Sequence, residues 1–142
     1  MPKLNGLVEV ALFVEDLPRA CAFYEQVLGL RKIQSSERGC VFRVANRQFL
    51  LLVTHEAART PSETSGGVVP PCAVPQREGP GPGHIAFAVS RGALDSWRTC
   101  VENHGVEVLS DITWQRGTRS LYFRDSDGHL IELATPGLWE VQ

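Results

Sequence analysis

An internal repeat is the feature that most constrains the fold, because the second half of the chain restates the pattern of the first. The stretch "EVALFV", which begins at Glu9, corresponds to "HIAFAV", which begins at His84, at a constant offset of seventy-five residues. Further on, "FRVANRQFLLL" from Phe42 matches "FRDSDGHLIEL" from Phe123 at an offset of eighty-one. Duplicated half-domains commonly meet about a pseudo-two-fold axis and create a cleft. We therefore expect two copies of one module.

Each half reads as a strand, a helix and three further strands. In the first half, Asp16 and Pro18 are typical of a helix start, and Gly29 is typical of a helix end. The second half repeats this order, with its helix ending at Gly105 and the turn "DSDG" between its last two strands. This order predicts an α+β fold, with module one at about 5–54 and module two at about 84–136 of a single domain covering 1–142.

The segment between the modules lacks any strand or helix periodicity. Residues 55–83, "HEAARTPSETSGGVVPPCAVPQREGPGPG", are rich in proline, glycine and serine. Long structureless loops inside a compact domain are usually either functional or disordered. The sequence leaves two interpretations open, a mobile linker and a lid over an active site.

Composition excludes several classes of protein. The net charge of -2 and the 21% of charged residues give no basis for nucleic-acid binding. The four cysteines form no C-x-x-C pair, so neither a structural zinc site nor a disulfide framework is indicated. The sequence has neither a signal peptide nor an apolar run long enough to span a membrane, so we expect a cytoplasmic protein with reduced thiols.

Three polar residues interrupt otherwise apolar strands: Glu9, His84 and Glu132. Taken singly, a strand glutamate is more often solvent-facing, and a histidine at a strand start is more often structural. A buried carboxylate, however, is costly unless it is paired, protonated or bound to a cation. Glu9 and His84 occupy the same place in the two repeats, so a pseudo-two-fold axis could bring the trio around one divalent metal. Leu51 stands at the position that matches Glu132, so the site has at most three protein ligands.

The strings "VEVALFVEDLPRACAFYEQVLGL", "GHIAFAV" and "LYFRDSDGHLIEL" resemble the vicinal oxygen chelate superfamily. This superfamily includes glyoxalase I, fosfomycin-resistance enzymes, extradiol dioxygenases, methylmalonyl-CoA epimerase and bleomycin-resistance proteins. The resemblance implies two βαβββ modules in a cup-shaped, incompletely closed mixed sheet, usually in a homodimer. It also implies a metal that chelates neighbouring oxygens of the substrate, with ligands at Glu9, His84 and Glu132.

The chain departs from several members of that superfamily. Many members have histidine where this chain has Glu9, which makes dioxygenase chemistry less favoured. Glyoxalase I looks like a four-ligand enzyme, with a carboxylate where this chain has Leu51. Fosfomycin-resistance enzymes share the three-ligand plan and a tyrosine at the place of Tyr122. Their arginine after the last glutamate has no counterpart in "LATPGLWEVQ", so fosfomycin modification is kept as an alternative.

Two glutamates and a neutral histidine suit Mn²⁺, Mg²⁺, Ni²⁺ or Zn²⁺ acting as a Lewis acid. We therefore expect a glyoxalase-like lyase, isomerase or transferase that acts on a small substrate with neighbouring oxygens. Glu132 or Glu9 could also serve as a catalytic base. The alternative from another class is a metal-free protein that sequesters its ligand, as bleomycin-resistance proteins do, in an aromatic-lined groove without turnover.

Substrate contacts are expected from residues that precede the last strand. Arg116 and Arg119 could hold a carboxylate or phosphonate through their guanidinium groups. Tyr122 could donate a hydrogen bond to a substrate oxygen, and Trp114 could line the cup. His129, in the turn "SDGHL", is expected to be exposed and without a role.

Overall fold

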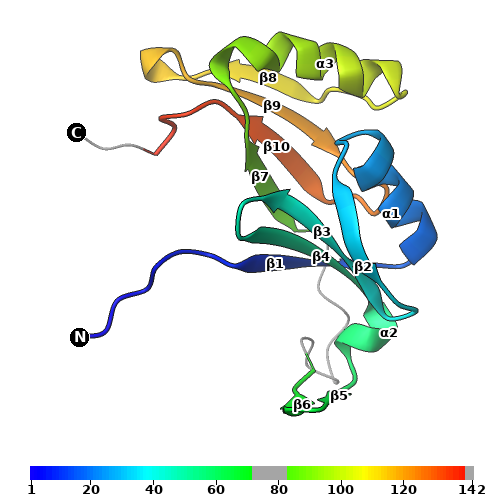
Figure 1. Ribbon diagram of the computed structural model, residues 1–142. Helices are drawn as coiled ribbons and strands as arrows, with labels where there is room; N and C mark the ends of the chain where they lie inside the picture. Colours follow the sequence, from blue (N-terminus) through cyan, green and yellow to red (C-terminus); the bar gives the residue numbers. More distant parts are fainter. Residues whose placement is uncertain (72–82, 140–142) are drawn as a thin grey trace. The chain divides into compact units, whose positions relative to one another are not determined.

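The computed structural model describes residues 1–71 and 83–139 (Figure 1). The chain divides into two compact units, Met1–Gly81 and Pro82–Gln142. The division falls in the segment that joins the two predicted modules. Each unit contains one four-stranded mixed sheet, which confirms the expected α+β class. Among the described residues, no helix has the length and apolar character that crossing a membrane requires.

Unit 1 begins with the strand, helix and three strands predicted for the first module. The strand order in its sheet is β1-β4-β3-β2, with β1 and β4 parallel and the other neighbours antiparallel. The elements are β1 (Glu9–Val14), α1 (Leu17–Gln26), β2 (Arg31–Ser35), β3 (Gly39–Ala45) and β4 (Gln48–Thr54).

Helix α1 covers one face of this sheet. It begins after Asp16, whose side chain accepts a hydrogen bond of 3.1 Å from the backbone N–H of Arg19; this capping satisfies one of the unpaired donors of the first turn. Tyr24 on its inner face is fully buried, and its ring lies 6.1 Å from that of Phe42. The core of unit 1 therefore lies between α1 and the sheet.

Unit 2 repeats the same plan with the strand order β7-β10-β9-β8. Apolar side chains from α3 and from alternate positions of β9 and β10 form its core, among them Leu94, Val101, Leu121, Phe123 and Ile131. Its elements are β7 (His84–Ala88), η1 (Arg91–Ala93), α3 (Leu94–Asn103), β8 (Ser110–Thr113), η2 (Gln115–Gly117), β9 (Arg119–Arg124) and β10 (Leu130–Ala134).

The strand register of the two units agrees residue for residue with the offsets found in the sequence. Glu9 pairs with Phe49 in unit 1, and His84 pairs with Leu130 in unit 2. Leu51 pairs with Val41, just as Glu132 pairs with Tyr122. Both pairings follow the offsets of seventy-five and eighty-one, so the sequence repeat is a repeat of backbone pairing as well.

The segment after β4 is more structured than its composition predicts. It contains a short helix, α2 (His55–Ala58), and a two-stranded hairpin, β5 (Ser62–Thr64) and β6 (Gly67–Val69). The hydroxyl of Thr54 caps α2 by accepting a hydrogen bond of 3.1 Å from the N–H of Ala57. The expectation of one long loop is therefore wrong for residues 55–69, while residues 72–82 lie outside the described part of the chain.

Candidate functional site

Glu132 lies on the face of the unit 2 sheet opposite α3. Its neighbours along β10, Ile131 and Leu133, point into the helix-covered core, so alternation turns Glu132 to the other face. Cross-strand pairing puts Tyr122 beside it on β9 and Ala86 beside it on β7. Although this face carries no helix, the Glu132 residue is only 4% exposed.

His84 and Glu132 form the central pair of this face. The Nε2 atom of His84 lies 3.2 Å from Oε1 of Glu132. The imidazole ring is half exposed, whereas the carboxylate is buried. The pair thus joins a buried anion to a nitrogen that solvent or a ligand can reach.

The second carboxylate oxygen of Glu132 is held by a chain of hydrogen bonds. The indole N–H of Trp114 donates to Oγ of Ser120 at 2.9 Å. Because an indole N–H only donates, the Ser120 hydroxyl proton is left for Oε2 of Glu132, which lies 2.6 Å away. The direction of the relay is fixed, so Oε2 is occupied and Oε1 is the oxygen that faces His84.

Ser120 was missed from sequence because a serine in a strand looks unremarkable among polar surface residues. Its signal was its position: in "TRSLYF" it lies two residues before Tyr122 and therefore on the same face. A serine at a fully buried strand position needs a hydrogen-bond partner. The carboxylate of Glu132 is that partner, because Glu132 pairs with Tyr122, two residues after Ser120 on β9.

Tyr122 completes the polar part of this face. Its ring centre lies 6.3 Å from that of His84. Burial raises the pKa of the Tyr122 phenol, and the charge of Glu132 and a hydrogen bond to that carboxylate raise it further. The phenol therefore keeps its proton at neutral pH and can donate a hydrogen bond.

Arg119 lies on the other face of the sheet. Its guanidinium donates to Asp95 of α3 at 3.0 Å and to both carboxylate oxygens of Asp111 at 3.1 and 3.0 Å. Strand alternation from Ser120 puts Arg119 on the α3 side, away from Glu132. Its donors are thus committed to an ion-pair network rather than directed at the site.

Arg116 and Trp114 lie in the turn between β8 and β9. Arg116 is exposed and adopts a left-handed backbone conformation with φ of 72°. Trp114 is 39% exposed, and its indole N–H is committed to Ser120. Of the four expected substrate contacts, only Tyr122 and Trp114 are linked to Glu132 by the interactions described above, and substrate contact stays a prediction for all four.

His129 differs from its expectation, because it is buried at 4% exposure. Its Nδ1 atom accepts a hydrogen bond of 2.8 Å from the backbone N–H of Gly83. The N–H of Leu130 donates to the carbonyl of Gly83 at 2.9 Å. The expectation of an exposed side chain is wrong because the ring closes over the residue that precedes His84 instead of extending from the turn.

Glu9 belongs to unit 1. It is exposed at the start of β1, on the face opposite α1, at the register position that His84 occupies in unit 2. Among the described residues of either unit, no three His, Cys, Asp or Glu side chains gather as a ligand set. The structure thus brings together two of the three predicted ligands, and the part of Glu9 stays a prediction.

The His84–Glu132 pair fits a divalent metal. When two ligand atoms occupy adjacent positions around one ion, each at about 2.0–2.2 Å from the metal, the two atoms lie about 3 Å from each other. Nε2 of His84 and Oε1 of Glu132 lie 3.2 Å apart. Imidazole nitrogen with carboxylate oxygen is a donor set that first-row divalent metals accept. A carboxylate whose other oxygen is already hydrogen-bonded also matches the supporting interactions that metal ligands usually have.

The chain is similar to one protein family and to several metallothiol transferases and fosfomycin resistance proteins. The model of the Glyoxalase/Bleomycin resistance protein/Dioxygenase superfamily matches residues 6–133. Metallothiol transferase FosB of Shouchella clausii is 26% identical over 139 residues, which cover 96% of this chain and 84% of that protein. Fosfomycin resistance protein FosX of Listeria innocua is 26% identical over 131 residues, which cover 92% of this chain and 89% of that protein.

Solved structures give the same assignment. Lactoylglutathione lyase from Agrobacterium tumefaciens superposes with a TM-score of 0.82 and 27% identity, covering 99% of this chain and 100% of that chain. A mutant of FosX from Listeria monocytogenes, complexed with Mn(II) and 1S,2S-dihydroxypropylphosphonic acid, superposes with a TM-score of 0.67 and 25% identity, covering 96% and 94%. Since the family model spans nearly the whole chain and the fold agrees, the protein belongs to the Glyoxalase/Bleomycin resistance protein/Dioxygenase superfamily.

Proposed function

We propose that this protein is a divalent-metal-dependent enzyme acting on a small substrate with neighbouring oxygens. The observation that carries the proposal is the geometry of Glu132. One oxygen is held by the Ser120 hydroxyl at 2.6 Å, and the other lies 3.2 Å from Nε2 of His84. A buried carboxylate held in this way is more typical of a metal ligand than of a surface charge.

Glu132 and His84 would supply two ligands, and Glu9 is proposed as the third. The argument for Glu9 is the repeat, which gives it the register position of His84. When bound, the metal supplies Lewis-acid chemistry that polarises a substrate oxygen. Tyr122 keeps its proton and would donate a hydrogen bond to an oxygen that becomes negatively charged during the reaction. Glu9 or Glu132 is proposed as the base.

Fosfomycin modification is the specific reaction that the relatives favour. FosB and FosX proteins match more than nine-tenths of this chain, although at 22–26% identity. The proposed chemistry is ring opening of an epoxide: a thiol or water forms a bond to carbon, one carbon–oxygen bond breaks, and the released oxygen takes a proton. Residues 133–142 contain no arginine that could hold a phosphonate. Other small epoxides and dicarbonyl adducts of thiols are therefore proposed as substrates beside fosfomycin.

Metal content is the first test. The protein would be purified without a metal-chelating tag and analysed by plasma mass spectrometry, together with Glu132→Gln, His84→Ala and Glu9→Gln. Glu63→Gln is the matched control, since Glu63 is exposed and lies on the β5–β6 hairpin. We expect near-stoichiometric metal in the parent and the control and reduced metal in the other three.

Turnover is the second test. Fosfomycin with low-molecular-weight thiols or with water alone would be followed by ³¹P NMR, and thiol adducts of dicarbonyls by absorbance, with Mn²⁺, Mg²⁺, Ni²⁺ or Zn²⁺ added. A parent protein that neither contains nor takes up metal would favour the metal-free, ligand-sequestering alternative. The homodimer and the cytoplasmic location also stay predictions, and light scattering of the purified protein tests the first.

A further inference from the structure

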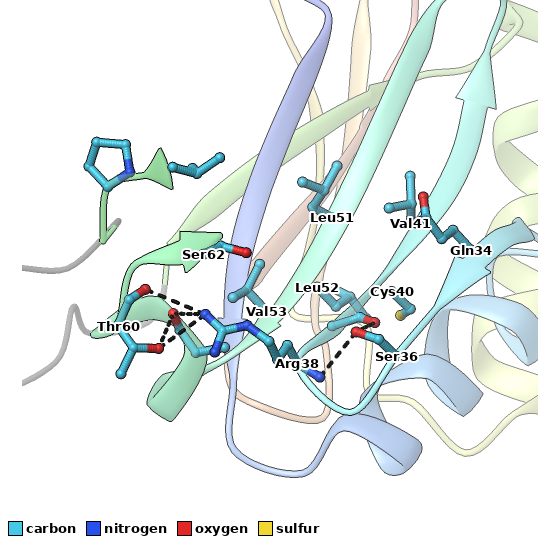
Figure 2. A pocket seen from close by; sticks show the side chains of 14 residues that line it. Gln34, Ser36, Arg38, Cys40, Val41, Leu51, Leu52, Val53, Thr60 and Ser62 are labelled. Carbon is cyan, nitrogen blue, oxygen red and sulfur yellow. Dashed lines mark hydrogen bonds between the residues drawn. The ribbon is translucent and has the colours of Figure 1, made fainter. Parts of the chain in front are cut away.

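Two cysteines in the core of unit 1 contact each other, although they lie on different elements. Cys21 belongs to the buried face of α1, and Cys40 belongs to β3, where it pairs with Leu52 of β4 (Figure 2). Strand alternation turns Cys40 to the same side as Phe42, whose ring lies against that of Tyr24 on α1. The two thiols interact through a side-chain hydrogen bond. A disulfide therefore needs only a small further approach of the two sulfur atoms.

A groove on the α1 side of unit 1 leads to one of these thiols. Its volume is about 650 Å³, and residues of α1, of β2 and of the turn after β2 line it. Cys21 is among the lining residues, whereas Cys40 is not. A small molecule in the groove consequently meets Cys21 first. None of the lining residues belongs to the His84–Glu132 site.

We propose that Cys21 and Cys40 form a thiol–disulfide exchange site for small disulfides that enter this groove. In the first step the Cys21 sulfur bonds to one sulfur of the incoming disulfide, the S–S bond of that disulfide breaks, and one small thiol leaves with the proton of Cys21. In the second step the Cys40 sulfur bonds to the Cys21 sulfur, the mixed disulfide breaks, and the other small thiol leaves with the proton of Cys40. The protein loses two electrons, and the small disulfide gains them. The inference goes beyond the proposed metal-dependent activity.

The surroundings of the two thiols set the order of these steps. Burial, followed by the interaction with Cys21, raises the pKa of the Cys40 thiol, and a thiol that keeps its proton is a poor nucleophile toward a molecule in solution. Cys40 is also only 2% exposed, whereas Cys21 lines the groove. Cys40 reacts once the mixed disulfide is in contact with it, because the high effective concentration of a contacting group offsets its weak ionisation.

The charges of the groove favour a cationic disulfide. Its charged lining residues are Glu25, Lys32 and Glu37. The ammonium of Lys32 on β2 lies 3.1 Å from the carboxylate of Glu25 on α1. Within residues 1–71 and 83–139, no ion pair includes Glu37. One carboxylate of the groove thus stays uncompensated and attracts a positively charged group. Cystamine, a small disulfide with an ammonium at each end, has this chemistry.

The disulfide would cross-link α1 to the sheet. The loop that it closes contains the end of α1, all of β2 and the turn that follows β2. Closing a loop restricts the unfolded chain and thereby stabilises the folded state. The oxidised protein should therefore melt at a higher temperature than the reduced protein, and dithiothreitol should reverse the difference. A lower melting temperature of the oxidised form would contradict a pair that closes within the folded protein.

The test uses the full-length protein with Cys72→Ser and Cys100→Ser, so that only Cys21 and Cys40 remain of its four cysteines. Cystamine is added to the folded, reduced protein, and intact mass and peptide mapping follow the reaction. We expect a loss of two hydrogens, a peptide link between Cys21 and Cys40, and recovery of both thiols with dithiothreitol. Thiols that stay free, or two bound cysteamine groups without the link, would overturn the proposal.

Single variants in the same background test the order of the steps. Cys40→Ser should stop at the mixed disulfide, with one cysteamine on Cys21. Cys21→Ser should be modified at least about tenfold more slowly, because Cys40 is buried and protonated. Equal rates in the two variants contradict the proposal. Alanine variants at both positions repeat the comparison without placing a hydroxyl in the core.

A second disulfide and two glutamate variants test the role of charge. Dithiodipropionate resembles cystamine in length but carries carboxylates, so it should react several-fold more slowly. Glu37→Gln should narrow this difference, whereas Glu63→Gln should not, since Glu63 is exposed and does not line the groove. A faster reaction of dithiodipropionate would overturn the preference for a cation. Glu132→Gln should react with cystamine like the parent, so this test succeeds or fails independently of the metal site.

Discussion

The hydroxyl of Ser120 lies 2.6 Å from Oε2 of Glu132, a short hydrogen bond between two buried groups on neighbouring strands. Trp114 donates to the same hydroxyl at 2.9 Å and thereby fixes the direction of the bond. Glu132 consequently has one committed oxygen and one oxygen that faces His84. This arrangement explains why a carboxylate can be buried in a strand of otherwise apolar residues: its charge is partly satisfied before any ligand arrives.

Ser120→Ala should weaken metal binding without removing a ligand. Losing a supporting hydrogen bond to a metal ligand typically costs about 10–100-fold in affinity, and we expect a loss in that range. Competition against a fluorescent chelator measures it. Ser110→Ala is the matched control, because Ser110 lies on the neighbouring strand opposite Tyr122. Equal losses of metal affinity in both variants would show that the hydrogen bond from Ser120 to Glu132 does not specifically support metal binding.

Much of the fold was predictable, since the helix signals, the turns and the repeat together predicted the strand, helix and three strands that recur in both units; α2 and the β5–β6 hairpin were not predicted. The role of Ser120 was not predictable, because its partner, Glu132, lies on another strand. The sequence of β9 by itself does not reveal how that strand pairs with β10. His129 was predicted wrongly for a related reason. A turn residue is usually exposed, but this imidazole finds a backbone N–H forty-six residues away in sequence, at Gly83. Both misses concern side chains whose partners are distant in the sequence, Glu132 for Ser120 and Gly83 for His129.

Arg119 provides a test of side-chain direction. Arg119→Met should lower the thermal stability of the protein, because the ion pairs with Asp95 and Asp111 are lost. The difference from the parent should shrink at high salt, where exposed ion pairs are screened. Because Arg119 faces α3, metal affinity should not change. Melting curves at low and high salt check the first part, and a large fall in metal affinity would contradict the second.

The buried thiol of Cys40 should lower the free energy of unfolding at alkaline pH. Burial, and after it the interaction with Cys21, raises the pKa of the Cys40 thiol to about 12. An unfolded cysteine has a pKa of about 8.5, so between that value and about 12 the unfolded state releases a proton that the folded state keeps. Unfolding is therefore favoured as pH rises through this window, with a slope of at most about 1.4 kcal/mol per pH unit.

Urea unfolding at several pH values between about 8 and 11 measures that slope over most of the window from about 8.5 to 12. Cys40→Ala should flatten the decline relative to the parent. Cys100→Ala is the control, since Cys100 is only partly buried. If both variants decline as steeply as the parent, other groups cause the alkaline loss.

His129 is predicted to hold the start of β7, where His84 lies. Its Nδ1 must be unprotonated to accept the Gly83 N–H at 2.8 Å. His129→Ala leaves that N–H without its acceptor, which we expect to cost about 1–2 kcal/mol. His129→Asn offers an amide oxygen near the place of Nδ1 and should recover part of the loss. Hydrogen exchange at the Gly83 amide should accelerate strongly in the alanine variant and less in the asparagine variant. Since Gly83 directly precedes His84, metal affinity should fall in the same order, and an unchanged exchange rate in His129→Ala would show that the imidazole does not hold this strand.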